Sequence, residues 1–527
     1  NPNYTQIPNI HFVYEARYNG AKIVAICPDY SPSSLHADQW VPVRIGSDAA
    51  LGLAFSQVII SERLYNKAFI QEQTDMPFLV RNDTRFFLRE SDLKEGGAED
   101  VFYVYDQVSR KVRPMSKDTL KLNGLDPALE GEFEVETQSG KAKVRPVFEL
   151  LKERLKDYTP EKASKICGTH PETIRNLARE IAKAKAVTNV TQSNFSKFYH
   201  GTEMERAQLL VFALCGHFGK KGSGFQAFPF LISDAMEEAF LYPNKTLPEG
   251  KKDFDRQWAP WVKSFKDKGY TDEMISYEFI RQFYDSKWFL SSVLTLYLHG
   301  GLKELMADQR KWDPSMKRDI DDYVKLSLEN RWQHADPDVP PRIIFAEGGN
   351  MLRRFRSYPK LIEVLLPKLS LLVDVNWRMS NTGRYADFIL PCAGWYERND
   401  VRWVTPLGTY LHGGKAVVDP VGDSRSEWHI HCLLAKKIQE RAREQGTLTF
   451  KDRQGKERRL DAIYDNLTYG GNYKEDEDAK LAADFIKVSG NLKGVTWEQL
   501  TKDGIARFSN VGKARVTVGN ATDLSPN

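Results

Sequence analysis

Short apolar runs alternate with longer amphipathic stretches along this chain. The runs at residues 23–26, 343–346 and 371–373 are rich in β-branched residues and are bounded by turn residues, and two of them end close to an Asp. Such runs are typical of buried parallel strands, and a helix between two of them makes a βαβ unit. The pattern therefore predicts an α/β protein.

A six-residue motif, Ala-Asp-x-x-(Val/Leu)-Pro, occurs at residues 37–42 and again at 386–391. Before each copy the chain runs in the same order through a loop Asn, an amphipathic helix, a strand and an Asp: from Asn3 to Asp29, and from Asn350 to Asp374. Parallel sheets bind ligands at the carboxyl ends of their strands, where backbone N–H groups reach phosphate and an acid accepts from ribose or base. The repeat predicts two nucleotide sites, or one site between the two βαβ units. The alternative is that these Asp residues only cap helices and that the motif recurs by chance.

A chain of 527 residues is too long for one hydrophobic core. We expect two Rossmann-like, doubly wound α/β domains related as a pseudo-repeat, and the start of a further C-terminal domain. The first would span 1–185 with an insertion at about 82–145. The second would span 186–435 with a helical, aromatic insertion at about 233–340, and 436–527 would be a linker and the start of the third. Capping and breaking residues predict helices from Asp48, from Thr159 to Gly168, from Pro171, at 204–215 and at about 424–445.

Composition excludes several classes of function. The net charge of +4 comes from balanced acids and bases, which leaves no footprint for nucleic acid, and no apolar run approaches the 18 residues of a membrane span. Five cysteines are scattered singly, which argues against a zinc site or an iron–sulfur cluster held by this chain. His429 and His431 lie two apart on a predicted helix and point to different sides, so they do not form a chelating pair. The glycine-rich residues 216–224 either cradle phosphate or only end a helix.

Both ends predict an internal segment of a longer protein. The first residue is Asn, the first βαβ unit lacks its opening strand, and no closing element precedes the last residue. No signal peptide can be read from such a start.

Taken together, residues 372–391, 28–31, 46–48 and 198–220 resemble the molybdopterin oxidoreductases of the dimethyl sulfoxide reductase superfamily. Residues 15–20, 28–34 and 393–397 are most similar to the type II branch, the catalytic α subunits of nitrate reductase, nitrite oxidoreductase, selenate, chlorate and perchlorate reductases, and dimethyl sulfide and ethylbenzene dehydrogenases. Two small departures are Gly383, where Ala is usual, and Cys392, where Ala is common.

The resemblance implies two molybdopterin guanine dinucleotides with molybdenum, or with tungsten as the alternative metal. Its site residues fall in three groups. For one dinucleotide they are Asn1 and Asn3 at the pyrophosphate, with Asp29, Ser31, Gly46 and Asp48 at the nucleoside. For the other they are Gly349 and Asn350 at the pyrophosphate, with Asp374, Thr382 and Asp387 at the nucleoside. Ser193, Asn194 and His200 would approach the pterins or the metal pocket.

The same resemblance places other parts outside this chain. A [4Fe-4S] cluster and the Asp that ligates molybdenum would precede residue 1, so no metal ligand is expected here, and most of the C-terminal domain would follow residue 527. The implied partners are an iron–sulfur β subunit, with a haem or membrane-anchor γ subunit as a further candidate, in an exported or membrane-associated complex.

The implied reaction is oxygen-atom transfer or hydroxylation on a small substrate such as nitrate, nitrite or another oxyanion. Three alternatives stay open. A hydrocarbon or sulfide dehydrogenase of the same branch shares the framework. A nicotinamide or flavin dehydrogenase would need G-x-G-x-x-G after the first strand, which neither repeat has. A cofactor-free scaffold would lose the polar strand-end residues, which remain here. The aromatic region at 233–340 either lines a substrate funnel or covers the sheet.

Overall fold

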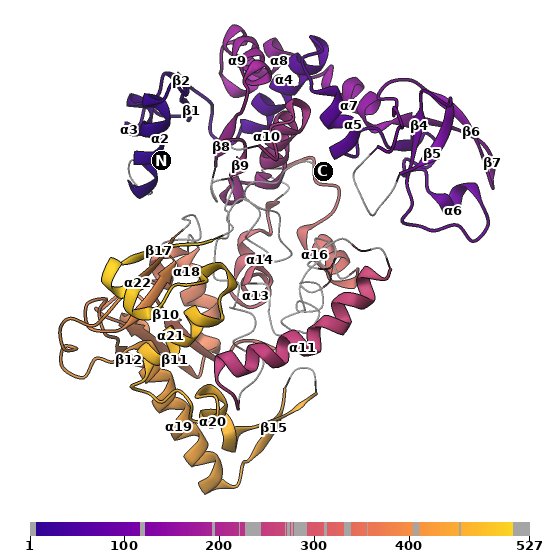
Figure 1. Cartoon of the computed structure of the whole chain (residues 1–527). Helices are drawn as coiled ribbons and strands as arrows, with labels where there is room; N and C mark the ends of the chain where they lie inside the picture. Colours follow the sequence, from indigo (N-terminus) through magenta and orange to yellow (C-terminus); the bar gives the residue numbers. More distant parts are fainter. Residues whose placement is uncertain are drawn as a thin grey trace.

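A computed structural model describes residues 7–115, 122–191, 195–220, 222–226, 244–268, 270, 275, 278, 292–309, 313–330, 339–355, 357–403, 410–452 and 455–509 (Figure 1). The described elements mix helices with several small sheets, which confirms the α/β class. The parallel sheets of this part of the chain have two or three strands each. The doubly wound pseudo-repeat stays a prediction.

The first repeat forms a small parallel unit made of α2 (Ile7–Tyr18), β1 (Val24–Ile26), α3 (Pro32–Leu35) and β2 (Gln39–Val41). β1 and β2 pair in parallel with Val24 opposite Gln39. The prediction that β1 is buried is wrong, because Ile26 is exposed. A strand with a single paired neighbour is left partly open to solvent.

A helical core follows, centred on α4 (Asp48–Ser61). Leu51, Phe55 and Ile59 are fully buried in it, because α4 is apolar on nearly every side. The helices packed around α4 are α7 (Val147–Leu155), α8 (Pro160–Cys167), α9 (Pro171–Lys183) and α10 (Gly201–Cys215). α10 lies after the expected domain boundary near 186, so this core draws on chain from both sides of it.

The predicted ends of α8 are confirmed. The Thr159 side chain accepts the backbone N–H of Lys162, and Gly168 ends the helix in the left-handed conformation at φ 79°. A residue without Cβ adopts that conformation at no steric cost.

The insertion expected at about 82–145 is a separate lobe with its own core, which includes Leu79, Leu88 and Val144 (Figure 1, right). Its main sheet has the antiparallel order β3-β7-β6, with a β4–β5 hairpin beside it. The elements of this lobe are β3 (Leu79–Arg81), α6 (Glu90–Leu93), β4 (Tyr103–Asp106), β5 (Lys111–Pro114), β6 (Phe133–Thr137) and β7 (Gly140–Pro146). The helix before the lobe, α5 (Lys67–Gln73), packs on α10 and buries Ile70 in the core around α4.

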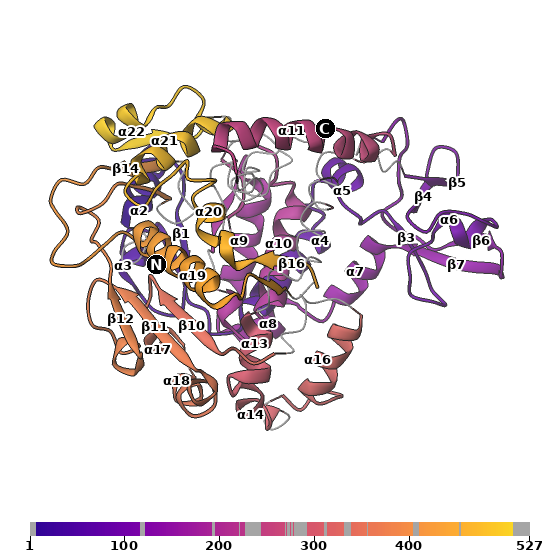
Figure 2. The ribbon, with the colours of Figure 1, turned by 90° about the horizontal axis from the view of Figure 1, so that it is seen from below.

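The second repeat contains a three-stranded parallel sheet of β10 (Ile343–Glu347), β11 (Leu371–Asn376) and β12 (Phe388–Pro391), whose strands lie side by side in Figure 2. β11 is the central strand, and its middle four residues are buried. The helix predicted before β11 is confirmed as an uninterrupted helical stretch over residues 358–368. It consists of α18 (Tyr358–Lys360), the π-helix η3 (Leu361–Leu365) and the 3-10 helix η4 (Leu366–Lys368). A separate short helix, α17 (Met351–Arg354), precedes it.

The last part of the chain packs two helices on an antiparallel sheet of order β13-β14-β17. Its elements are β13 (Asp400–Trp403), β14 (Tyr410–Gly414), α19 (Glu427–Gln445), β15 (Thr449–Lys451), β16 (Glu457–Arg459), η7 (Leu460–Ala462), α20 (Ile463–Leu467), α21 (Asp478–Val488), η8 (Gly490–Leu492), α22 (Trp497–Asp503) and β17 (Ile505–Arg507). The other described elements are β8 (Thr188–Val190), η1 (Phe195–Lys197), β9 (Gly224–Gln226), α11 (Leu247–Lys266), α13 (Ser292–His299), α14 (Leu302–Leu305), α16 (Ile320–Glu329) and η5 (Gly383–Tyr385). Within the described ranges no helix has the length and apolar character needed to cross a membrane.

The contact between α4 and α10 gives a test of this core. A Cβ at Gly52 would lie 2.9 Å from the backbone carbonyl of Ala207, so Gly52→Ala must push the two helices apart. We expect a loss of about 1–2 kcal/mol in the free energy of unfolding, because overpacking outweighs the gain in helix propensity. Urea denaturation followed by circular dichroism measures it. Gly414→Ala, whose Cβ would meet no atom within 4 Å, is the control and should stay within about 0.5 kcal/mol of wild type.

Candidate functional site

Asp374 is the polar centre of the second repeat. It is the fourth residue of β11 and is completely buried. Ser380 Oγ donates to Asp374 Oδ2 at 2.8 Å, and Gly383 N donates to Ser380 Oγ at 3.0 Å. Asp374 Oδ1 is buried without a hydrogen-bond partner. An unpaired buried acceptor costs free energy, so this oxygen suits an N–H donor brought by a ligand.

Gly383 permits the position of that carboxylate. A Cβ at residue 383 would lie 2.7 Å from Asp374 Oδ2 and 3.3 Å from Met379 Sδ. Ala is the usual residue here in the family that the sequence resembles. The carboxylate of this chain therefore occupies space that a methyl group would take.

Asn350 and Thr382 form a second polar layer at the carboxyl end of β10. Thr382 is fully buried; its Oγ1 donates to Asn350 Oδ1 at 3.0 Å and accepts the Leu352 N–H at 3.1 Å. Asn350 Oδ1 also caps Arg353 N at 3.2 Å. The structure thus joins Asn350, which is predicted at a pyrophosphate, to Thr382, which is predicted at the nucleoside of the same dinucleotide. Their roles toward a ligand stay predictions.

The turn before Asn350 is open. Gly348 has φ 63°, and a Cβ there would meet no atom within 4 Å; at Gly349 the nearest atom would be Nη1 of Arg354 at 3.5 Å. Such a turn lets a phosphate approach the backbone, and the guanidinium supplies opposite charge.

The Asp of the doubled motif lies at the other edge of each sheet. Leu372 N donates to Asp387 Oδ2 at 2.8 Å, and Ile23 N donates to Asp38 Oδ2 at 2.8 Å. Both acids precede the second strand of a parallel pair, so they lie at the amino ends of the strands. The bond from Ile23 lowers the pKa of the Asp38 carboxyl. The structure therefore does not bring Asp387 to the carboxyl edge.

The predicted residues of the first repeat occupy two turns. Asp29 is exposed and Ser31 is buried, on the turn between β1 and α3. Gly46, at φ 81°, precedes α4, and Asp48 is the first residue of that helix. Burial raises the pKa of the Asp48 carboxyl. Asn1, Asn3, Ser193 and Asn194 lie outside the described residues.

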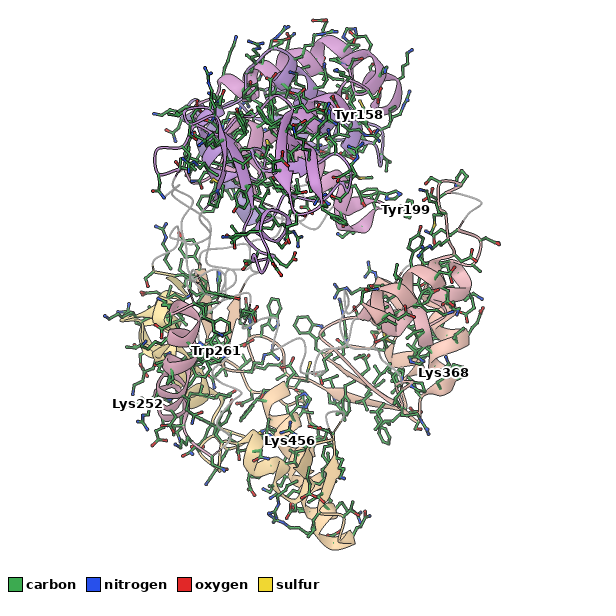
Figure 3. All side chains as sticks on the ribbon, turned by 90° about the vertical axis from the view of Figure 1, so that its right-hand side faces the viewer. Tyr158, Tyr199, Lys252, Trp261, Lys368 and Lys456 are labelled. Atoms are coloured by element: carbon green, nitrogen blue, oxygen red, sulfur yellow. The ribbon has the colours of Figure 1, made fainter. Side chains whose placement is uncertain are left out.

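His200 belongs to a cluster that the sequence did not reveal. It lies at the start of α10 in the left-handed conformation at φ 56°, and its Nε2 is 3.7 Å from Asp313 Oδ2. The Tyr199 hydroxyl donates to Asp313, and Gln309 Nε2 donates to Tyr199 Oη at 3.3 Å. The bond to Asp313 raises the pKa of Tyr199. Figure 3 shows Tyr199 at the edge of the body that carries Tyr158. Residues more than a hundred positions apart meet here, which no local pattern signals.

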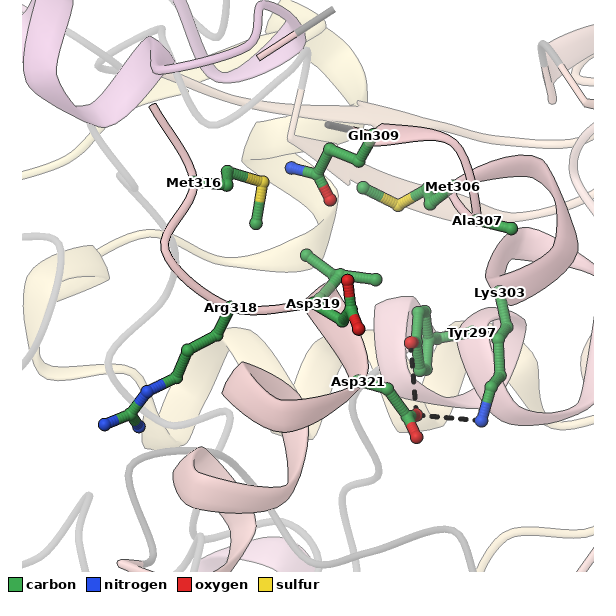
Figure 4. A pocket seen from close by; sticks show the side chains of 10 residues that line it. Tyr297, Lys303, Met306, Ala307, Gln309, Met316, Arg318, Asp319 and Asp321 are labelled. Atoms are coloured by element: carbon green, nitrogen blue, oxygen red, sulfur yellow. Dashed lines mark hydrogen bonds and ion pairs between the residues drawn. The ribbon is translucent and has the colours of Figure 1, made fainter. Parts of the chain in front are cut away.

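Beside this cluster is a cavity of about 110 Å³ (Figure 4). Gln309 contributes to its wall, and the Gln309 Oε1 atom is buried without a hydrogen-bond partner. Asp321 lies at the rim, where Lys303 Nζ at 2.8 Å and Lys325 Nζ at 3.2 Å hold the pKa of its carboxyl at about 2. The other wall residues are Tyr297, Met306, Ala307, Met316, Arg318, Asp319 and Ile320.

The described residues contain no group of three or more metal-binding side chains. His429 Nδ1 lies 3.0 Å from Asp476 Oδ1 and His431 Nε2 lies 3.0 Å from Glu347 Oε1, so the two histidines contact different acids. Burial raises the pKa of the Cys215 and Cys432 thiols to about 12, so both behave as small hydrophobic groups.

Comparison with known proteins assigns the family. The model of the molybdopterin oxidoreductase family matches residues 1–437. The chain is 32% identical to the perchlorate reductase subunit alpha of Dechloromonas aromatica (strain RCB), over 95% of this chain and 52% of that protein. It is 34% identical to the chlorate reductase subunit alpha of Ideonella dechloratans, over 100% of this chain and 55% of that protein. It is 33% identical to the dimethylsulfide dehydrogenase subunit alpha of Rhodovulum sulfidophilum, over 96% and 51%.

The chain belongs to the molybdopterin oxidoreductase family, and the resemblance inferred from its sequence is confirmed. Membership implies a molybdenum cofactor carried by a pterin. The chain spans about half the length of these relatives. The unpaired Asp374 oxygen supplies a buried acceptor near the carboxyl end of β11, and the glycine turn at Gly348 leaves open space after β10.

Ser380 tests the buried carboxylate. Ser380→Ala removes the donor to Asp374 Oδ2, so we expect the free energy of unfolding to fall by about 1–3 kcal/mol. Ser380→Thr keeps the hydroxyl and should retain most of the stability. The matched control is Ser357→Ala, because the Ser357 side chain makes no capping bond. Equal free energies of unfolding for Ser380→Ala and Ser357→Ala would contradict the role of the Ser380 hydroxyl as a stabilising donor to Asp374.

Asp321 should make the free energy of unfolding depend on pH. Its pKa is lowered from 3.8 to about 2 in the folded chain, chiefly by Lys303, so its stabilisation is complete above pH 4 and is lost as the pH falls from about 4 to 2. The pair is solvent-accessible, so we expect no more than about 1 kcal/mol. Unfolding measured from pH 6 to pH 2 should show a shallower loss in Asp321→Asn. Parallel curves for the two proteins would rule out this contribution.

Proposed function

We propose that this chain is the central part of the catalytic subunit of a molybdenum oxidoreductase that binds two molybdopterin guanine dinucleotides. The observation that carries the proposal is Asp374, a fully buried carboxylate with one oxygen left unpaired beside an open glycine turn. A carboxylate accepts the N–H edge of guanine in charge-assisted hydrogen bonds, which are the stronger kind.

In this proposal the second repeat holds one nucleotide tail. Asp374 accepts from the base, and Ser380 keeps the carboxylate in place. Gly349 and Asn350 leave space for the pyrophosphate, with Arg354 as its counter-charge. Thr382 fixes Asn350. Asp387 contributes indirectly, because it accepts the Leu372 N–H and so stabilises the pairing of β11 with β12.

The first repeat holds the other tail. Asp29, Ser31, Gly46 and Asp48 are its described residues, and Asn1 and Asn3 complete the assignment. Support comes from the strand pairing, since Val24 pairs with Gln39 and Val373 with Phe388, the same offset of 15 residues in both repeats. We infer from this that the two α/β units are a Rossmann-like pseudo-repeat, in which the first unit extends past the expected boundary near 186 to include α10, and the third part begins after 436.

The bound metal, molybdenum or tungsten, would supply two-electron oxygen-atom transfer or hydroxylation. We propose an oxyanion as substrate, because two relatives are named perchlorate and chlorate reductase subunits. A sulfide or hydrocarbon dehydrogenase is the second candidate, favoured by the dimethylsulfide dehydrogenase relative. His200, Ser193 and Asn194 would approach the pterins or the metal pocket.

The three relatives are named as alpha subunits, which supports partner subunits for this chain as well. We propose an iron–sulfur β subunit, with a haem or membrane-anchor γ subunit as a further candidate. A [4Fe-4S] cluster and the Asp ligand of molybdenum are assigned to the segment that precedes residue 1 in the longer protein.

Metal and nucleotide analysis of the purified full-length protein tests the proposal. We expect one molybdenum or tungsten and two guanine nucleotides per chain after denaturation. Protein that carries neither metal nor guanine nucleotide would contradict it.

The double variant Asp374→Ala/Asp48→Ala tests the residues. Both nucleotide tails lose a carboxylate, so we expect retained guanine nucleotide to fall at least tenfold while circular dichroism keeps most of the helical signal. Asp423→Ala removes an exposed carboxylate and is the control. Full retention in the double variant would refute the assigned roles.

A further inference from the structure

Two exposed tryptophans and an arginine form a cluster that the assignments above do not use. The Trp377 and Trp395 rings lie 5.6 Å apart and are tilted by 42°, and the Arg402 guanidinium lies 4.1 Å from the centre of the Trp395 ring. Each Trp is 53% exposed. We call Trp377, Trp395 and Arg402 the aromatic platform.

A series of ion pairs holds the arginine of the platform in place. Arg402 Nε donates to Asp400 Oδ2 at 2.9 Å, and Asp400 also pairs with Arg398 at 3.2 Å. Arg398 is nearly buried and forms an ion pair with Glu427 at the start of α19. This chain of charged contacts fixes the guanidinium on the indole, so the platform is largely preformed.

The platform lies at the carboxyl edge of the parallel sheet. Trp377 directly follows the last residue of β11, and Trp395 follows the end of β12 by four residues. The loop that Trp377 opens also contains Ser380, whose hydroxyl holds Asp374. The buried carboxylate and the Trp377 indole therefore belong to one strand end and one loop, and Trp395 comes from the loop after the neighbouring strand β12.

The unpaired Asp374 oxygen and the aromatic platform together indicate which kind of ligand this edge of the sheet would bind. Tryptophan is a residue of high average burial, and two adjacent indoles left more than half exposed form an apolar surface that suits a flat ring. Aromatic side chains stack on a nucleobase through its π-face, and arginine adds positive charge suited to phosphate. Asp374 Oδ1 has no hydrogen-bond partner and is an acceptor that suits the N–H edge of such a base.

We propose that Trp377 and Trp395 stack on the planar purine of the bound guanine nucleotide, with Arg402 orienting Trp395 and facing the phosphate. The proposal rests on the proposed function, and it names residues that recognise the base face, whereas Asp374 recognises its edge.

Full-length protein produced without its cofactor and titrated with GMP by calorimetry tests the platform. Trp377→Leu and Trp395→Leu should each weaken GMP binding by about five- to hundredfold, the loss expected for one stacking contact. Trp377→Phe and Trp395→Phe keep an aromatic ring and should retain most of the affinity, which separates lost stacking from lost folding. Tyr396→Leu removes a neighbouring exposed ring and should bind as wild type does.

The outcomes are distinct. If wild type binds GMP and both Leu variants bind it as tightly as Tyr396→Leu, the platform is overturned and the proposed function stands. If wild type binds no GMP, and the cofactor-loaded protein releases no guanine nucleotide, both proposals fail. Loss of binding in the Leu variants with recovery in the Phe variants supports the platform.

Discussion

The hydrogen bond from the Leu372 backbone to the Asp387 carboxylate is the interaction on which the second repeat depends. It ties the amino ends of β11 and β12 and holds the register that sets Asp374 opposite Ile389. Because side chains alternate along a strand, a shift of one residue would turn Asp374 to the other face. The same bond, between Ile23 and Asp38, holds the first repeat. The doubled motif thus holds the amino ends of the strands, on the side opposite the carboxyl ends where we propose the nucleotide tails.

Both repeats contain this hydrogen bond, but they differ in the burial of the acid near the carboxyl end of the first paired strand. Asp374 lies within β11, is completely buried and has one oxygen without a partner, whereas Asp29 follows the end of β1 by three residues and is exposed. At the strand position of Asp374 the first repeat has Ala25. A buried, half-satisfied carboxylate is costly until a donor reaches it, and an exposed one is solvated by water. If both repeats bind nucleotide tails, binding relieves more unfavourable energy in the second repeat than in the first.

Contacts between distant segments give the structure its other polar sites. Asp313 reaches Tyr199 and His200 across more than a hundred residues, and Arg398 reaches Glu427 across 29 residues. In each case an acid fixes a side chain that lies on a distant segment of the chain.

The sequence alone determined the local elements and the family. Caps at Thr159 and Gly168 act within a few residues, so the ends of α8 could be predicted, and the strand-end motifs around Asp374 identified the molybdopterin oxidoreductases. Only the tertiary structure decided which acid is buried and at which edge it lies. Those properties depend on strand register and on packing between distant segments, and a linear motif such as Ala-Asp-x-x-Leu-Pro carries no information about either.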